Sequence, residues 1–320
     1  MNRFAISLIC IFSLAISSEI LPSAKFFASG IVTDFVVENG RLYVGTDRGT
    51  VDIFDIDRNK MLYQVALEPI EDGRGGAIPP KVLSVDVRDG ELLIVSIGKE
   101  GFRRVWLYRD FTLQKVADEN RKLFIKEARF SDNGHIVVGT FGSQLALYGV
   151  DESYEIYRRS ASSSSLGALA LDYSGGKLFF GDEAGDIYIF DIKSGREVEK
   201  LSAGHLDKVH SLAYAKGVVV SGGHDRRVGV HFLGATHYYI KTGFPVFCVG
   251  ISPNGNRALF SSGDRQILQL FDVKTGKFVG RLAGHQALVN KILFLSEERV
   301  ISSERSRMLL LWSLPAPDSQ

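Results

Sequence analysis

The sequence has almost no net charge, little proline and very little cysteine. Its 38 Lys and Arg residues against 37 Asp and Glu residues leave a formal net charge of +1 over 320 residues. A dedicated nucleic-acid-binding protein carries a clear basic excess, so we expect no nucleic-acid partner. Only 8 prolines stand beside 33 glycines, which excludes collagen-like and low-complexity chains and favours many tight turns. With 45% hydrophobic residues, the chain can bury a sizeable core, which excludes a disordered protein.

Cysteine is limited to Cys10 and Cys248. Cys10 lies in an N-terminal apolar run, and Cys248 lies in a second apolar stretch where we expect an inert, buried thiol. Once the first segment is removed, a single thiol remains and no internal disulfide can form. The sequence also lacks the Asn-x-Ser/Thr acceptor for glycosylation. An exported protein without either feature fits a bacterial periplasm better than a eukaryotic secretory route.

The first residues predict export. Arg3 is followed by an apolar run of thirteen residues over 4–16, with small residues at Ala15 and Ser17. A helix of that length covers about 20 Å, less than the roughly 30 Å of a bilayer core, so the pattern is typical of a secretory signal peptide. We predict a signal peptide over 1–17, one domain over 18–320, a periplasmic location and no membrane span after signal removal. An uncleaved N-terminal anchor is the alternative.

A short pattern returns seven times along the rest of the chain. Two apolar residues, separated by one position, are followed by an aromatic residue or, in one copy, by a histidine. These closing residues are Phe54, Tyr108, Tyr148, Phe190, His231, Phe271 and Trp312. Five of the six intervals between them are 40 to 42 residues, and the first is 54. A fixed period of about 40 residues is typical of a β-propeller.

The fourth repeat shows the order of elements within one unit. Four short segments at 168–171, 177–180, 186–190 and 197–201 are separated by glycine-containing turns. Their period of two and their β-branched and aromatic residues favour antiparallel strands. Stacking such small sheets around an axis buries both faces of each sheet. The sequence therefore predicts an all-β fold, a seven-bladed β-propeller.

The two ends of the chain predict how the ring closes. Only eight residues follow Trp312, and they include Pro315 and Pro317, so the last repeat lacks its own fourth strand. The segment 24–28, which precedes the first repeat, has alternating character and no assigned partner. An open ring would leave its end blades exposed. We expect 24–28 to form the outer strand of the last blade.

The repeats resemble WD repeats over essentially the whole chain after the leader. Gly-His pairs stand before two first strands, at Gly204-His205 and Gly284-His285. In that family, such a His joins a strand Ser or Thr, an Asp and a Trp in a structural hydrogen-bonded network. The resemblance assigns that network here to His205, Ser221, Asp225 and His231 in the fifth repeat, and to His285 and Trp312 in the seventh, where Ser306 replaces the Asp.

Two turns also resemble another propeller class. Asp191 to Gly195 and Asp272 to Gly276 follow the Asp-x-x-Ser/Thr-Gly pattern of quinoprotein-like repeats. That class docks a Trp a few residues later, whereas Val198 and Phe278 stand there in this chain. The WD-type interpretation is favoured. Signal, size and repeat count further resemble the exported propeller accessory proteins of bacterial periplasmic nitrate reductases.

Two groups of residues allow a chemical site. Five histidines fall within 33 residues, at His205, His210, His224, His231 and His237. Imidazole is a common metal ligand, but two of these residues occupy network positions, so we predict no metal and no cofactor. Carboxylates at turns could line an axial mouth, as in lactonase propellers; they are Asp47, Asp182, Asp186 and Asp264. Ordinary turn roles are favoured for them, and no catalytic residue is predicted.

One face of the expected propeller carries charged recognition elements. An insertion at 68–80 lengthens the first interval, and long loops on rigid scaffolds often bind partners. Arginine, which is enriched at interface hot spots, recurs in the turns between second and third strands. The partner-binding residues predicted are Glu71, Asp72, Arg74, Arg103, Arg104, Arg226, Arg227, Arg265, Arg305 and Arg307.

We therefore expect a periplasmic protein-binding scaffold that is not an enzyme. The resemblance to the nitrate reductase accessory proteins implies a helper in assembly of, or electron delivery to, that enzyme, with its components as partners. Two alternatives stay open: a scaffold for envelope protein assembly, and a lactonase- or quinoprotein-like propeller with an axial site.

Overall fold

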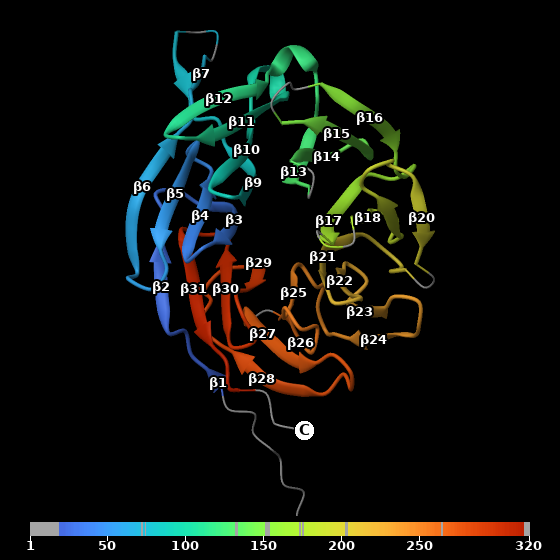
Figure 1. The fold of residues 1–320 in the computed structure, drawn as a ribbon. Helices are drawn as coiled ribbons and strands as arrows, with labels where there is room; N and C mark the ends of the chain where they lie inside the picture. The colour runs from blue at the N-terminus through green and yellow to red at the C-terminus, as the bar shows by residue number, and fades with distance from the viewer. Residues whose placement is uncertain are drawn as a thin grey trace, which may run out of the picture.

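A computed structural model of the protein describes residues 19–316 except 72, 74, 132, 133, 151–153, 173, 175, 202, 203 and 264. The signal peptide predicted over 1–17 lies outside the described residues. The described strands form seven small antiparallel sheets arranged as blades around a central axis (Figure 1). The predicted seven-bladed β-propeller is confirmed.

The blades follow one another in chain order, and each is given from its innermost strand outward. Blade 1 contains β3 (Val32–Glu38), β4 (Arg41–Thr46), β5 (Thr50–Asp55) and β6 (Lys60–Ala66). Blade 2 contains β9 (Val82–Arg88), β10 (Glu91–Ile97), β11 (Arg103–Arg109) and β12 (Thr112–Ala117). Blade 3 contains β13 (Ile125–Phe130), β14 (His135–Thr140), β15 (Gln144–Gly149) and β16 (Glu155–Ser160). Blade 4 contains β17 (Leu166–Asp172), β18 (Lys177–Asp182), β19 (Ile187–Asp191) and β20 (Glu197–Lys200).

The last three blades repeat the same plan. Blade 5 contains β21 (Val209–Ala215), β22 (Val218–Gly223), β23 (Arg227–Phe232) and β24 (His237–Lys241). Blade 6 contains β25 (Val249–Ile251), β26 (Arg257–Ser262), β27 (Ile267–Asp272) and β28 (Phe278–Leu282). Blade 7 contains β29 (Val289–Phe294), β30 (Arg299–Glu304) and β31 (Met308–Ser313), and its outer strand comes from the other end of the chain.

Elements outside the blades lie in the connections. The insertion after β6 forms a two-stranded hairpin of β7 (Ile70–Glu71) and β8 (Ala77–Ile78), which projects from the disc (Figure 1). Two short 3-10 helices, η1 (Lys99–Gly101) and η2 (Glu119–Arg121), lie between β10 and β11 and between β12 and β13. All three elements therefore belong to loops around blades 1 to 3.

The N-terminal segment closes the ring, as predicted. Strand β2 (Ala24–Phe27) pairs antiparallel with β31, with Ala24 opposite Leu311 and Phe27 opposite Met308. Strand β1 (Glu19–Ile20) adds a contact that the sequence did not predict, because it pairs parallel with β28 of blade 6. One short segment thus joins the outer edges of blades 6 and 7 (Figure 1).

Tight turns explain why so many glycines are needed. The turn between β3 and β4 has Asn39 at φ +48° and Gly40 at φ +74°, and Asp89 and Gly90 adopt the same left-handed pair between β9 and β10. Two consecutive residues with positive φ define the turn that matches the twist of paired strands, and Asn-Gly and Asp-Gly favour it. The sequence therefore fixes the register of these hairpins locally.

Candidate functional site

The two faces of the disc are distinguished by their turns. On one face, which we call the loop face, the turn between second and third strands bonds to the loop that enters the same blade. Phe141 N–H donates to Phe124 O at 2.9 Å, and His224 N–H donates to Lys208 O at 2.9 Å. On the opposite face, Ile56 N–H donates to Gly40 O at 3.0 Å and joins the two remaining turns of blade 1. Each face is therefore a ring of mutually anchored turns.

The predicted network of blade 5 is present in three of its four positions. His205 Nδ1 lies 2.8 Å from a carboxylate oxygen of Asp225, and His205 Nε2 lies 2.8 Å from Ser221 Oγ. Burial lowers the pKa of His205 although Asp225 favours the charged ring, so the imidazole is neutral and donates from Nδ1. The predicted fourth member is wrong: His231 Nε2 has no hydrogen-bond partner among the described residues, and its ring stacks on His237 with centroids 5.8 Å apart.

Blade 7 completes the network, but with a different acid. Trp312 Nε1 donates to Ser302 Oγ at 2.7 Å, and Ser302 Oγ lies 2.7 Å from His285 Nε2. The carboxylate of Glu304 then accepts from His285 Nδ1 at 2.9 Å. Ser306, which was expected in place of the Asp, donates to the other Glu304 oxygen at 2.7 Å. The assignment of Ser306 is therefore corrected to Glu304, whose longer side chain reaches the same point from two residues earlier.

The network residues hold the loop face together. Because Trp is only a donor, the chain of bonds runs from Trp312 through Ser302 and His285 to Glu304. The same carboxylate accepts the backbone N–H of Gln286 at 2.8 Å, which ties the loop entering blade 7 to the end of β30. These side chains therefore act as structural anchors for the loops.

The predicted partner-binding arginines separate into exposed and buried groups. Exposed guanidinium groups lie in the loop-face turns of blades 5, 6 and 7, at Arg226, Arg265, Arg305 and Arg307. Arg227 is half-buried, 5.6 Å from the ring centroid of Tyr239 and 3.8 Å from an Asp225 oxygen.

Arg104 is buried and cannot belong to a binding surface. Only 4% of the residue is exposed, and its Nε donates to a Glu119 oxygen at 2.6 Å. A terminal nitrogen donates to Glu68 O at 3.1 Å. The prediction for Arg104 is therefore wrong, because successive strand residues point to opposite faces and its side chain points inward.

The hairpin β7–β8 is the insertion that the long first interval predicted. Glu71 is exposed and pairs with Lys99 at 3.0 Å, which links the hairpin to η1. Ile78 is also exposed. The two other residues predicted there, Asp72 and Arg74, lie outside the described residues.

The histidines do not converge on a metal-binding arrangement. His210 Nε2 and His224 Nδ1 lie 3.1 Å apart, and burial, with the nearby Lys208, lowers the pKa of His210 to about 4. Within the described part of the chain, no group of three or more His, Cys, Asp or Glu side chains could hold a metal ion. Cys248 is buried, and burial raises the pKa of its thiol to about 12.

The axis of the propeller encloses a cavity of about 520 Å³ lined mainly by the innermost strands. The turn carboxylates Asp47, Asp182 and Asp186 are not among its lining residues. Asp182 is instead buried in its turn, where it accepts from Ser162 Oγ at 2.6 Å. Asp264 lies outside the described residues.

Other carboxylates line this axial cavity, and they are paired with cations. Asp34 accepts from Lys291 Nζ at 2.6 Å and lies 3.5 Å from Arg129. Burial acts to raise the pKa of Asp34, but Lys291 and Arg129 outweigh it and the pKa is lowered. Glu127 lies 3.1 Å from Arg129. These groups join blades 7, 1 and 3 across the cavity wall.

The turns that resembled quinoprotein-like repeats are self-contained. Asp272 accepts from the backbone and the hydroxyl of Thr275 at 2.7 and 2.6 Å. The side chains of Val198 and Phe278, which stand where that class docks a Trp, are exposed on outer strands. The structure therefore gives these turns the role of hairpin caps and supports the WD-type interpretation.

Comparison with known proteins agrees with this class. No protein-family model matches the chain. It is 23% identical over 266 residues to periodic tryptophan protein 2 homolog from Dictyostelium discoideum. The aligned region is 80% of this chain and 28% of that protein. It is 26% identical over 183 residues to autophagy-related protein 16 from Arabidopsis thaliana, 55% of this chain and 36% of that protein. The aligned parts thus span about a third of these relatives.

The fold, the two His–Ser–acid networks and these similarities define a WD-repeat-like seven-bladed β-propeller. Among the described residues, no helix has the length and apolar character needed to cross a membrane.

Proposed function

We propose that this propeller is a non-catalytic protein-binding scaffold, exported to the periplasm by the N-terminal signal. Its partner belongs to the periplasmic nitrate reductase system, where the scaffold serves as an accessory protein of the NapL type in assembly or electron delivery. Signal, chain length and repeat count support that specific assignment.

One observation carries the scaffold role: exposed arginines gather on the loop face. Arg226, Arg265 and Arg305 make no ion pair with a described carboxylate, and each lies at the tip of a short turn. Guanidinium groups form paired hydrogen bonds with carboxylates and are enriched in interface hot spots. The arrangement therefore suits an acidic protein surface.

The turns that carry these arginines are held in place. Thr242 N–H donates to Arg226 O at 2.9 Å, and Arg305 N–H donates to Leu288 O at 2.9 Å. A pre-ordered surface loses less conformational entropy when a partner binds. Rigid turns around a closed ring thus favour recognition without rearrangement.

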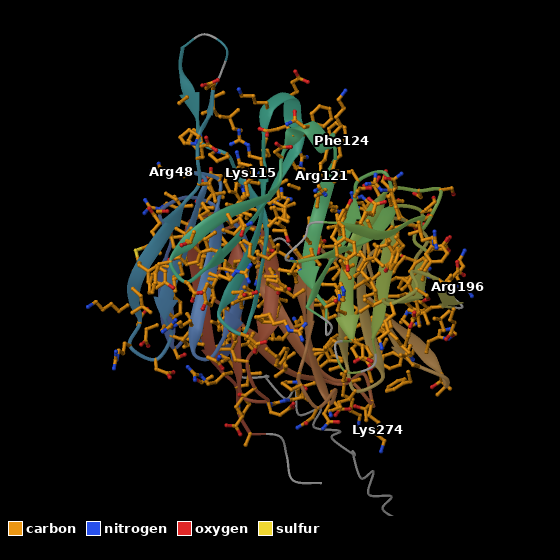
Figure 2. All side chains as sticks on the ribbon, turned by 45° about the horizontal axis from the view of Figure 1, so that its top comes forward. Arg48, Lys115, Arg121, Phe124, Arg196 and Lys274 are labelled. Carbon is orange, nitrogen blue, oxygen red and sulfur yellow. The ribbon has the colours of Figure 1, made fainter. Side chains whose placement is uncertain are left out.

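Co-purification from periplasm tests the proposal. The tagged full chain is expected to capture nitrate reductase components, identified by mass spectrometry. The triple variant R226E/R265E/R305E should reduce that capture by at least about tenfold. The matched control is K274E, an exposed cation in a turn of the opposite face, at the other side of the molecule from Phe124 in Figure 2.

Three outcomes would contradict parts of the proposal. Equal capture by the triple variant and the control would show that the three arginines do not bind the partner. Recovery of envelope-assembly components without reductase would replace the named partner. Turnover of a small-molecule substrate by the purified chain would replace the scaffold role.

A further inference from the structure

A group of three phenylalanines and two cations is supplied by the loop-face ends of blades 2 and 3, and one of the cations reaches blade 4. We call it the Phe–cation patch; its members are Phe102, Arg103, Phe124, Lys126 and Phe141. The rings of Phe102 and Phe124 lie with centroids 4.9 Å apart. The Arg103 guanidinium lies 5.9 Å from the Phe124 centroid and 5.6 Å from the Phe141 centroid. Lys126 Nζ lies 5.8 Å from the Phe141 centroid.

Two of the three phenylalanines of the patch are open to solvent. Phe124 is 47% exposed and Phe141 is 43% exposed, whereas Phe102 is half-buried. Figure 2 shows Phe124 and Arg121 on the side of the molecule from which the hairpin β7–β8 projects. Exposed aromatic groups that adjoin each other mark interaction surfaces more often than scattered ones.

The two cations have no carboxylate partner within the described chain. Arg103 Nε donates to Ile125 O at 3.2 Å, and another of its nitrogens donates to Gly101 O. Lys126 Nζ donates to Leu166 O at 2.7 Å and to Gly167 O. Both cations bind only neutral carbonyl groups, and burial lowers the pKa of each.

The neighbouring cations provide a contrast. Arg104, next to Arg103 in β11, is paired with Glu119 at 2.6 Å, and Lys115 is paired with Glu68 at 2.9 Å. Arg103 and Lys126 differ from these neighbours because neither forms an ion pair with a described carboxylate, although Glu127 and Glu183 act on Lys126 from beyond ion-pair distance. A half-desolvated cation gains more from an incoming carboxylate than a fully hydrated one.

The patch is also rigid and open toward the axis. Arg103 N–H donates to Leu123 O at 3.1 Å, which fixes the start of β11 against the loop that enters blade 3. Lys126 and Phe141 both line the axial cavity. An extended chain could therefore rest on Phe124 and continue toward the cavity mouth.

We propose that the Phe–cation patch binds a segment of a partner protein in which a carboxylate adjoins an aromatic or large aliphatic side chain. The carboxylate pairs with Arg103, the apolar side chain packs on Phe124 and Phe141, and Lys126 adds positive charge from the axial cavity. This inference rests on the proposed scaffold function and specifies the partner chemistry that the scaffold recognises.

Fluorescence polarisation with designed peptides tests the patch directly. The probe is a fluorescein-labelled nonapeptide in which Glu and Phe alternate, compared with the same peptide carrying Gln for each Glu. The wild-type chain from residue 18 is expected to bind the Glu peptide at least about tenfold more tightly than the Gln peptide. R103Q and F124A should each weaken binding of the Glu peptide by about tenfold.

Matched controls separate recognition from folding. Phe111, 87% exposed in a turn of the opposite face, gives the control F111A, and the exposed Arg196 gives R196Q. Both controls should bind as the wild type does, and thermal unfolding of every variant should show an intact fold. If R103Q unfolds, F141A takes its place, because an exposed ring can be removed without a buried cavity.

Several results would overturn the inference. One is equal affinity of the wild type for the Glu and Gln peptides. Another is an equal loss of affinity for the Glu peptide in F124A and F111A, and a third is the absence of binding at about 1 mM peptide. Tighter binding of a labelled oligouridine than of the Glu peptide would assign the patch to single-stranded RNA instead. If F124A still captures the periplasmic partner, the patch inference fails and the scaffold function stands. If the wild type captures none, the scaffold function itself fails.

Discussion

His285 Nδ1 lies 2.9 Å from the carboxylate of Glu304, and both side chains are buried at the loop face of blade 7. This pair ends the chain of hydrogen bonds that begins at Trp312. It places an acidic residue, only 1% exposed, at the end of strand β30. Burial acts to raise the pKa of Glu304, but the donors around it outweigh burial and the pKa is lowered. The carboxylate is therefore ionised and serves as a buried acceptor.

Removal of this acceptor should destabilise the propeller. In E304A, the buried donors of His285, Gln286 and Ala287 lose their common partner, so we expect a loss of about 3 kcal/mol in the free energy of unfolding. S306A removes only a half-buried hydroxyl and should cost about 1 kcal/mol or less. Equilibrium urea unfolding measures both. A larger loss in S306A would restore the assignment made from sequence.

The fold could be predicted from sequence because its signals are local and repeated. Closing residues such as Phe190 and Phe271 follow the same apolar pattern at nearly constant spacing, and turn pairs such as Asn39-Gly40 fix the hairpins. The closing strand could be predicted because the last repeat lacked an outer strand. The parallel pair of β1 and β28 could not, since two residues carry no periodic signal.

The site could be predicted only where side-chain length and direction follow the family pattern. His205, Ser221 and Asp225 do so. Glu304 does not, because a glutamate two residues before the expected position reaches the same histidine. Arg103 and Arg104 are indistinguishable by residue type, and only the alternation of β11 makes one half-exposed and the other buried.

The N-terminal strand should be essential for stability. Phe26 is 1% exposed, and its ring meets Phe54 edge-on with centroids 5.7 Å apart. F26A leaves a cavity between blades 7 and 1 and should cost about 3 to 5 kcal/mol. The matched control is F27A, since Phe27 is 61% exposed on the same strand. Thermal unfolding should show a large drop in the melting temperature for F26A and a small change for F27A. Equal changes would contradict the role of strand β2 in closing the ring.

Asp86 should make stability depend on pH. Burial raises the pKa of Asp86 to about 6, although Arg129 and Lys291 partly oppose it. The folded state then holds a proton between about pH 4 and pH 6 that the unfolded chain has released. The protonated Asp86 therefore adds its whole stabilising contribution to the free energy of unfolding below the unfolded pKa of about 3.9. This contribution is lost as the pH rises through about 6.

The substitution D86N isolates this effect. The amide oxygen can still accept from Phe130 N–H, which donates to Asp86 at 2.8 Å. Relative to the wild type, the variant should gain about 2 kcal/mol as the pH rises from 4 to 7. Asp34, whose pKa is lowered, acts in the opposite direction in both proteins, and it shares Arg129 and Lys291 with Asp86. Parallel urea midpoints across this range would contradict the assignment.

Replacement of Gly167 should destabilise the protein because blades 4 and 5 approach closely there. It occupies an irregular position in β17, and a Cβ atom there would lie far inside van der Waals contact with the carbonyl oxygen of Val209 in β21. That obstacle is backbone, so it cannot rotate away. We expect G167A to destabilise the protein by about 1 to 3 kcal/mol.

Gly142 provides the control for this substitution. A Cβ atom at Gly142 would meet nothing within 4 Å, and its φ lies outside the left-handed region. G142A should therefore leave the urea midpoint nearly unchanged. A G167A variant as stable as the wild type would show that the two blades can separate without cost, which a tightly stacked ring does not allow.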